Sequence, residues 1–231
     1  MKRLLVLLLA TLLLFGFVAC DDNTPEPPAA EEPGTPIIPD TPDNPGDPDM
    51  PQPGVKKWDG TVDKEWYDPQ QNEFKLNSPS QLAGLALLVS EGNDFNGKKI
   101  LLTADIDLNN LEWTPIGGTS RDTEQNISFF RGNFDGQGHK ILNLKITQDE
   151  NTDNSVSGFF GVIAEAEISN LTISSGNVTD AGDTAGGVVG AVIDEEGKAS
   201  SITNCHNNAS ISGAQASAGI VGRAYGNGIS R

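Results

Sequence analysis

The feature that most constrains this fold is a short phrase that recurs three times in the last third of the chain, two glycines flanking two apolar residues. The copies are Gly158–Gly161, Gly187–Gly190 and Gly219–Gly222, and the first two are followed by Ile-x-Asn at Ile168 and Ile202. Units that recur about every 30 residues are typical of solenoids, because each coil buries its apolar face only by stacking on its neighbours. We predict a solenoid in which these glycines permit positive φ and close backbone approach at a repeated turn.

The asparagine of the second phrase is the expected corner residue of each coil. An upstream relative, Ile141-Leu-Asn143-Leu144, extends the series, so that its isoleucines lie at 141, 168, 202 and 229, with spacings of 27, 34 and 27 residues. We expect Asn143, Asn170 and Asn204 to share one phase, where stacked side-chain amides hydrogen-bond each other and the turn backbone. The alternative is that these asparagines contact a polar ligand.

These residues carry a family resemblance. The glycine phrase with its Ile-x-Asn-Leu partner resembles the GLUG motif of bacterial surface proteins, whose repeats coil as a right-handed β-helix. Four upstream stretches resemble the usual lead-in of such proteins: Ser80–Ala86, Asp105–Leu108, Trp113–Gly117 and Phe134–His139. The resemblance covers about residues 58 to 231 and implies an all-β fold, a short right-handed parallel β-helix of four to five coils over 98–231. It implies no particular reaction, because the family is defined by its repeats.

The first 19 residues have the pattern of a lipoprotein signal peptide. Two basic residues precede an apolar run of 15 residues, which is too short to span a membrane. Phe17–Cys20 resembles a lipobox, which implies cleavage before Cys20 and a lipid anchor on that cysteine. The acidic pair after it resembles the export signal of Bacteroidota lipoproteins, which implies the outer face of the outer membrane; retention on the inner leaflet is the alternative.

Residues 20–55 are predicted to form an extended stalk behind the lipidated cysteine. From Pro33 to Pro51 every third residue is proline, the period of a polyproline II helix. At about 3.1 Å per residue the stalk would reach roughly 100 Å from the membrane. Featureless disorder is the alternative interpretation.

Residues 56–97 are predicted to cap the N-terminal end of the coils, with a helix over 79–91. Ser78 is a good N-cap, Gln81 completes a capping box with it, and Gly92 stands where a C-terminal cap belongs. The helix would keep the first open strand edge from recruiting another chain.

Candidate ligand contacts lie near the start of the coils. Four aromatic residues offer either a stacking platform for sugars or core packing, which we favour: Trp58, Trp66, Tyr67 and Trp113. Ile100–Leu108 alternates like a half-buried strand, so Asp105 and Asp107 are expected to project outward together. Such carboxylates, with Asp135, could act as acid and base on a glycosidic bond, but solenoid surfaces supply carboxylates routinely.

Other patterns predict little chemistry. The net charge of −17 disfavours nucleic acid and anionic lipid surfaces as partners. With Cys20 acylated, Cys205 has no disulfide partner and is interpreted as a small buried residue. Asp149–Ser155 spaces oxygen ligands as a calcium loop does, yet Phe160 replaces its final glutamate, so a solvated hairpin is favoured over calcium. No other metal or cofactor is predicted. Asp183-Thr184-Ala185 resembles the O-glycosylation sequon of Bacteroidota, which implies sugar on Thr184.

The favoured function is a non-enzymatic surface lipoprotein that presents a β-helix for adhesion or for binding glycans or host matrix. Two alternatives remain open: a polysaccharide lyase, hydrolase or carbohydrate-binding accessory protein, and a fragment of a longer repeat adhesin. Ile229-Ser-Arg231 begins another Ile-x-Asn phrase without completing it. We therefore expect an uncapped last coil through which another chain makes contact.

Overall fold

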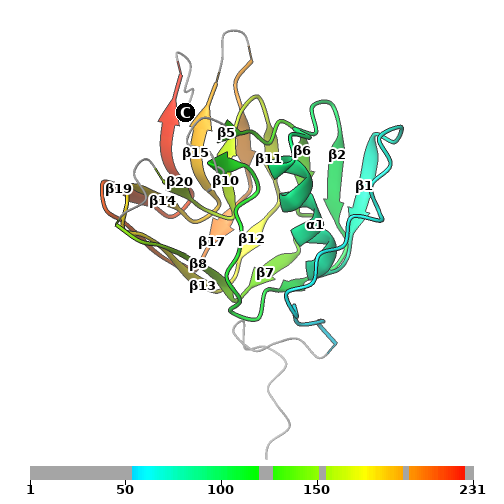
Figure 1. The fold of residues 1–231 in the computed structure, drawn as a ribbon, viewed down its shortest axis with the longest axis horizontal. Coiled ribbons are helices and arrows are strands. Elements are labelled where there is room, and N and C mark those ends of the chain that lie inside the picture. The colour runs from blue at the N-terminus through cyan, green and yellow to red at the C-terminus, as the bar shows by residue number, and fades with distance from the viewer. Residues whose placement is uncertain (1–53, 120–126, 151–154, 195–197, 227–231) are drawn as a thin grey trace, which may run out of the picture. The chain divides into compact units, whose positions relative to one another are not determined.

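The computed structural model describes residues 54–119, 127–150, 155–194 and 198–226 (Figure 1). The predicted leader, Cys20, all but the last two residues of the predicted stalk, and Ile229 lie outside these ranges. Within them, no helix is long and apolar enough to cross a membrane. The buried core is drawn entirely from residues between Trp58 and Val192, with half-buried residues to Val221 packed on it. The described residues from 54 onward form one compact unit with a hydrophobic core of its own, which is the character of an independent domain.

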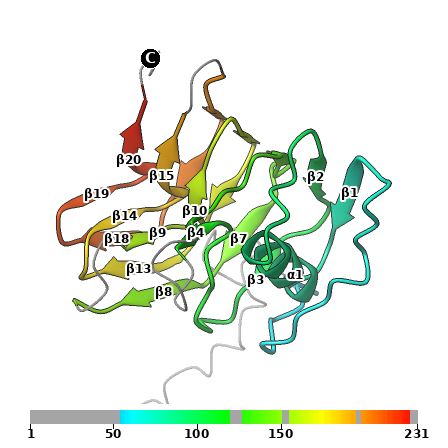
Figure 2. The same ribbon diagram turned by 45° about the horizontal axis from the view of Figure 1, so that its top comes forward.

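The described chain is a parallel β-solenoid of about four turns, with one helix, as predicted. Five parallel sheets run along the stack, and the largest has the order β1-β2-β6-β11-β16. Figure 2 shows β8, β13 and β18 side by side in successive coils. The strands are β1 (Glu73–Leu76), β2 (Lys99–Leu102), β3 (Ile106–Asp107), β4 (Gly118–Thr119), β5 (Ile127–Ser128), β6 (Asn133–Asp135), β7 (Lys140–Leu142), β8 (Leu144–Gln148), β9 (Val156–Ser157), β10 (Phe160–Ile163), β11 (Glu167–Ser169), β12 (Thr172–Ile173), β13 (Gly176–Asp180), β14 (Thr184–Gly186), β15 (Val189–Ile193), β16 (Ser201–Thr203), β17 (His206–Asn207), β18 (Ser210–Gly213), β19 (Ala216–Ala218) and β20 (Val221–Tyr225).

The strand register corrects the predicted repeat spacing. Ile100, Phe134, Ile168 and Ile202 occupy equivalent positions, so one coil in this sheet is 34 residues long. Ile141, by contrast, pairs with Ile106 and Ile173 in the next sheet. The 27-residue interval from Ile141 to Ile168 therefore compared two different sides of the solenoid.

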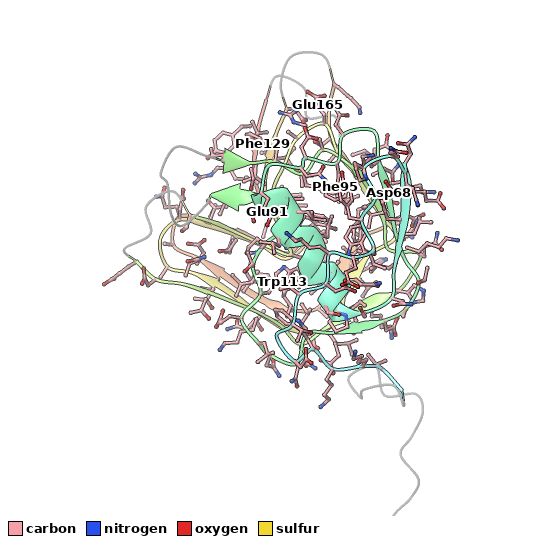
Figure 3. All side chains as sticks on the ribbon, turned by 45° about the vertical axis from the view of Figure 1, so that its right-hand side comes forward. Asp68, Glu91, Phe95, Trp113, Phe129 and Glu165 are labelled. Atoms are coloured by element: carbon pink, nitrogen blue, oxygen red, sulfur yellow. The ribbon has the colours of Figure 1, made fainter. Side chains whose placement is uncertain are left out.

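Helix α1 (Pro79–Ser90) begins at Pro79 as predicted and ends one residue before the predicted end, with Glu91 as its C-cap. The Ser78 hydroxyl accepts a hydrogen bond from the Gln81 backbone N–H, and Gly92 follows the C-cap with φ +98°. In a capping box, the side chain of Gln81 would accept a hydrogen bond from the N–H of Ser78. Here Gln81 Oε1 accepts from the N–H of Asn77 instead. Figure 3 shows α1 lying in front of the ring of strands, at the N-terminal end of the stack. Its apolar residues, among them Leu82 and Leu85, belong to the core, so the helix closes this end.

The recurring glycines stack in register. Phe160, Val189 and Val221 pair in β10, β15 and β20, which aligns the three glycine phrases. None of the six glycines has positive φ, so that part of the prediction is wrong. Close approach explains all of them except Gly219: a Cβ on Gly161, for example, would lie 2.2 Å from the carbonyl oxygen of Gly117.

The predicted strand over 100–108 is broken by a corner. β2 ends at Leu102 and β3 begins at Ile106 in a different sheet. The alternation of side chains across this segment consequently fails at the corner, and Leu101, expected on the outer face, is only 7% exposed.

Candidate functional site

A cleft of about 290 Å³ with mixed polar and apolar lining lies beside Trp113, where several segments of the first coils meet. It is bounded by the C-terminal residue of α1, the segment 112–118, β5, and the facing ends of β8 and β9. Its lining consists of Ser90, Glu112, Trp113, Thr114, Pro115, Gly117, Gly118, Ser128, Ile146, Thr147, Gln148, Ser155 and Val156. The volume is near the lower end of the range for ligand pockets.

Trp113, labelled in Figure 3, is a fixed part of the cleft wall. Its ring stacks on Phe159 with a centroid separation of 5.5 Å and meets the edge of Trp58 at 5.8 Å. Its indole N–H donates to the carbonyl oxygen of Phe159 at 3.1 Å. Trp113 is only 4% exposed, so it offers no open ring face to the cleft.

Glu112 is the charged residue of the lining. Its carboxylate accepts hydrogen bonds from the backbone N–H and hydroxyl of Thr147, each 3.1 Å long, and pairs with Lys145 at 2.9 Å. Burial alone would raise the pKa of Glu112, but the bonds from Lys145 and Thr147 outweigh this and hold the pKa below its ordinary value. The carboxylate is therefore ionised at neutral pH, with half of the side chain exposed.

The rest of the lining is neutral and mixes hydroxyl groups with small apolar surfaces. Thr114 is exposed, the Ser128 hydroxyl donates to the carbonyl oxygen of Gly118 at 3.2 Å, and Pro115 and Ile146 supply apolar contact. Donors and acceptors of this kind match the alternating hydroxyl groups and C–H faces of a sugar. The lining contains no arginine or lysine, which disfavours an anionic ligand.

The four aromatic residues singled out in the sequence do not form one platform. Trp58, 8% exposed, is buried against Trp113. Trp66 and Tyr67 belong to a separate cluster with Phe74 and Phe95, where the ring centroids are 5.3 to 6.3 Å apart. All four pack on the core, which favours the packing interpretation over the sugar platform.

Asp105 and Asp107 do not project outward together, which corrects the prediction. Asp107 is 1% exposed and accepts hydrogen bonds from the N–H of Asn109 at 2.7 Å and from Asn143 Nδ2 at 2.8 Å. Asp105 accepts from the N–H of Lys140 at 3.0 Å and lies 3.1 Å from His139 Nδ1. Neither aspartate lines the cleft, and both serve to hold turns together.

The predicted corner asparagines form a ladder at two of three positions. Asn204 Nδ2 donates to Asn170 Oδ1 at 2.8 Å, and Asn170 Nδ2 donates to Asp135 Oδ1 at 3.0 Å. Asn143 does not share this phase, because Leu144 pairs with Gly176 at the next corner of the solenoid. All three asparagines have φ between 50° and 57°, a left-handed conformation that asparagine tolerates better than most residues.

Two further sequence candidates are buried or half-buried. Thr184 is 1% exposed and its hydroxyl donates to Asp183 Oδ1 at 3.0 Å, which argues against the prediction that it carries a sugar. Cys205 is half-buried against the core, and this desolvation raises the pKa of its thiol. Both observations assign these side chains to packing.

Within the described ranges, no group of three or more His, Cys, Asp or Glu residues is arranged to hold a metal ion. The hairpin with calcium-like spacing, 149–155, falls partly outside those ranges. At its end, the Ser155 hydroxyl donates to Asp180, which also accepts from Ser157 at 2.7 Å.

Comparison with protein-family models, with curated proteins and with solved structures gave no match.

Proposed function

We propose that this chain is a non-enzymatic lipoprotein of the bacterial outer surface that uses its solenoid to bind a neutral glycan in the cleft beside Trp113. The observation that carries the glycan assignment is the lining, which is rich in hydroxyl groups and has one carboxylate and no cationic side chain. A rigid coil scaffold adds to this, because a pre-formed cleft loses little conformational entropy on binding. The resemblance of the repeats to GLUG-motif surface proteins supports the same class of function.

The surface location rests on the sequence before the solenoid. The apolar leader ending at Cys20 and the proline stalk after it are consistent with a lipid anchor and a spacer. We expect an antibody against residues 44–231 to label intact producing cells, and a Cys20→Ser chain to lose most of that signal. Labelling that appears only after the outer membrane is broken would contradict surface display.

The glycan assignment is tested with residues 44–231 on a glycan array, followed by calorimetry with the glycans that bind. Glu112→Gln removes the charge from the carboxylate acceptor, so we expect at least about tenfold weaker binding, the typical loss for a hydrogen bond to a charged group. Thr114→Ala should also weaken binding.

Glu167→Gln is the matched control. Glu167 is exposed, accepts a hydrogen bond from Asn133 at 2.7 Å and lies outside the cleft lining. Binding that survives Glu112→Gln and Thr114→Ala unchanged would refute the cleft as the site. Release of reducing sugar from a bound glycan would refute the non-enzymatic assignment.

A further inference from the structure

Most hydroxyl groups that line the cleft beside Trp113 already use their hydrogens within the protein. Four of the five donate to a carbonyl or carboxylate oxygen: Ser90 to Leu87 at 2.7 Å, Ser128 to Gly118 at 3.2 Å, Thr147 to Glu112 at 3.1 Å, and Ser155 to Asp180. Carbonyl oxygens and ionised carboxylates only accept, so the shared hydrogen in each pair belongs to the hydroxyl group. A hydroxyl group whose one hydrogen is engaged offers a ligand only its lone pairs.

Glu112 adds another acceptor to the same lining. Its carboxylate has places for roughly four hydrogen bonds, and three are taken by Lys145 and by the N–H and hydroxyl groups of Thr147. The carboxylate therefore keeps about one place for a donor from a ligand. The indole N–H of Trp113 cannot balance these acceptors, because it donates to the carbonyl oxygen of Phe159.

The acceptors are within reach of a ligand. Glu112 and Thr147 are exposed and Ser128 is half-buried, while two other polar residues of the lining, Thr114 and Gln148, carry groups that can donate or accept. A ligand group that only accepts, such as an ether, ester or sulfate oxygen, would face these lone pairs with no hydrogen between them, and an unpaired polar group is costly to bury. A free hydroxyl group supplies the missing hydrogen.

We propose that the cleft selects glycans by their free hydroxyl groups, which act as hydrogen-bond donors to Glu112, Thr147 and Ser128. The inference rests on the proposed glycan-binding function and names the glycans that the site takes, neutral hexoses with unsubstituted hydroxyl groups. Sugars that are O-methylated, O-acetylated or sulfated at the contacting positions bind poorly, because each substituent replaces a donor with an acceptor. A site built to bond a ligand hydroxyl group discriminates strongly against an analogue that lacks it.

Fluorinated sugars test the direction of these hydrogen bonds. The probes are the methyl glycosides of glucose, galactose and mannose, titrated into residues 44–231 by calorimetry or NMR, together with their deoxy and deoxyfluoro analogues at each ring position. Fluorine keeps a weak acceptor but carries no hydrogen, so a hydroxyl group that donates is lost equally in both analogues. At the contacting positions we expect both analogues to bind about fivefold more weakly than the parent sugar, the loss of one ordinary hydrogen bond.

Two outcomes of this titration would overturn the inference and leave glycan binding intact. One is a deoxyfluoro analogue that restores the affinity lost in its deoxy counterpart, since the hydroxyl group would then be an acceptor. The other is a set of deoxy analogues that all bind like the parent sugar. Failure of all three parent sugars to bind would also overturn it, and the glycan array would then decide separately whether the proposed function stands.

Thr147→Val carries the test to the protein. Valine has nearly the shape of threonine but lacks the hydroxyl group, so we expect the parent sugar to bind about fivefold more weakly. Thr147→Ser restores the hydroxyl group and should recover the affinity. Thr179→Val is the matched control, because Thr179 pairs with Thr147 at the same position of the next coil and lies outside the cleft lining. Equal losses for Thr147→Val and Thr179→Val would overturn the inference.

Discussion

Replacing Gly158 with alanine should destabilise the solenoid by about 3 kcal/mol, the upper end of the range for overpacking in a rigid interior. A Cβ at this position would lie 2.6 Å from the backbone nitrogen of Gly190 in the next coil and 2.6 Å from the carbonyl oxygen of Phe160. Both obstacles are backbone atoms within the stack, so neither can rotate away. Denaturant unfolding of residues 44–231 measures the loss as a lower midpoint.

The same column of glycines supplies a graded series. A Cβ on Gly187 would lie 2.2 Å from the carbonyl oxygen of Gly219, but that oxygen belongs to the last described coil, whose residues are less buried than those of the coils before it. A Cβ on Gly219 would meet only Asn207 Nδ2, at 4.0 Å. We expect Gly187→Ala to cost less than Gly158→Ala, and Gly219→Ala to change the free energy of unfolding by less than about 0.5 kcal/mol.

Equal losses for Gly158→Ala and Gly219→Ala would contradict the expectation, since they would mean that Gly219 is packed as closely as Gly158.

The stacking of glycine phrases could be predicted because each phrase is short and free of insertions. Phe160, Val189 and Val221 consequently fall in register, even though the loops between coils differ in length. Of the two roles predicted for these glycines, positive φ and close backbone approach, only the second is confirmed. The glycines are required where neighbouring backbones approach closely, and positive φ is carried by asparagines at other corners.

The phase of Asn143 could not be predicted, because the phrase Ile141–Leu144 resembles the corner phrase but lies on the next side of the coil, where Ile141 pairs with Ile173. Asp135 and Lys140 pair with Ser169 and Thr172, so the corner after β6 has four residues where the next coil has two. A repeated phrase in the sequence then marks equivalent chemistry without marking equivalent positions. The same limit applies to Asp105 and Asp107, whose alternation is interrupted by a corner.

The cleft was beyond prediction for a different reason. Its lining comes from α1 and from several segments between residues 112 and 156, which belong to different coils. Trp113 was named in advance, but Glu112 and Thr147 come together only because the bridge between Glu112 and Lys145 sets their register. A spacing pattern cannot reveal a site assembled by stacking of this kind.

The second large effect is expected at Asn170, the middle residue of the corner ladder. Asn170→Ala removes the donor to Asp135 and the acceptor for Asn204, and it forces alanine to adopt φ near 52°. One hydrogen bond contributes about 1 kcal/mol and a left-handed alanine costs about 1 kcal/mol, so we expect a loss of about 2 to 3 kcal/mol. Asn170→Gly also lacks the hydrogen bonds but adopts this φ without strain, so it should be about 1 kcal/mol more stable than Asn170→Ala.

Asn170→Asp separates the hydrogen bonds from the backbone through its pH dependence. In the parent chain, burial alone would raise the pKa of Asp135, but bonds from Asn170 and Gln137 outweigh it and lower that pKa. A carboxyl group whose pKa is lower in the folded than in the unfolded chain stabilises the fold at pH values above its unfolded pKa. This contribution is lost as the pH falls through the folded pKa. With Asn170→Asp, two carboxylates meet at the corner, and protonating one of them relieves the repulsion. The stability of the Asn170→Asp variant relative to the parent should therefore improve as the pH falls from 7 towards about 4. A deficit that stays constant over this range would show that Asp135 does not depend on the Asn170 amide.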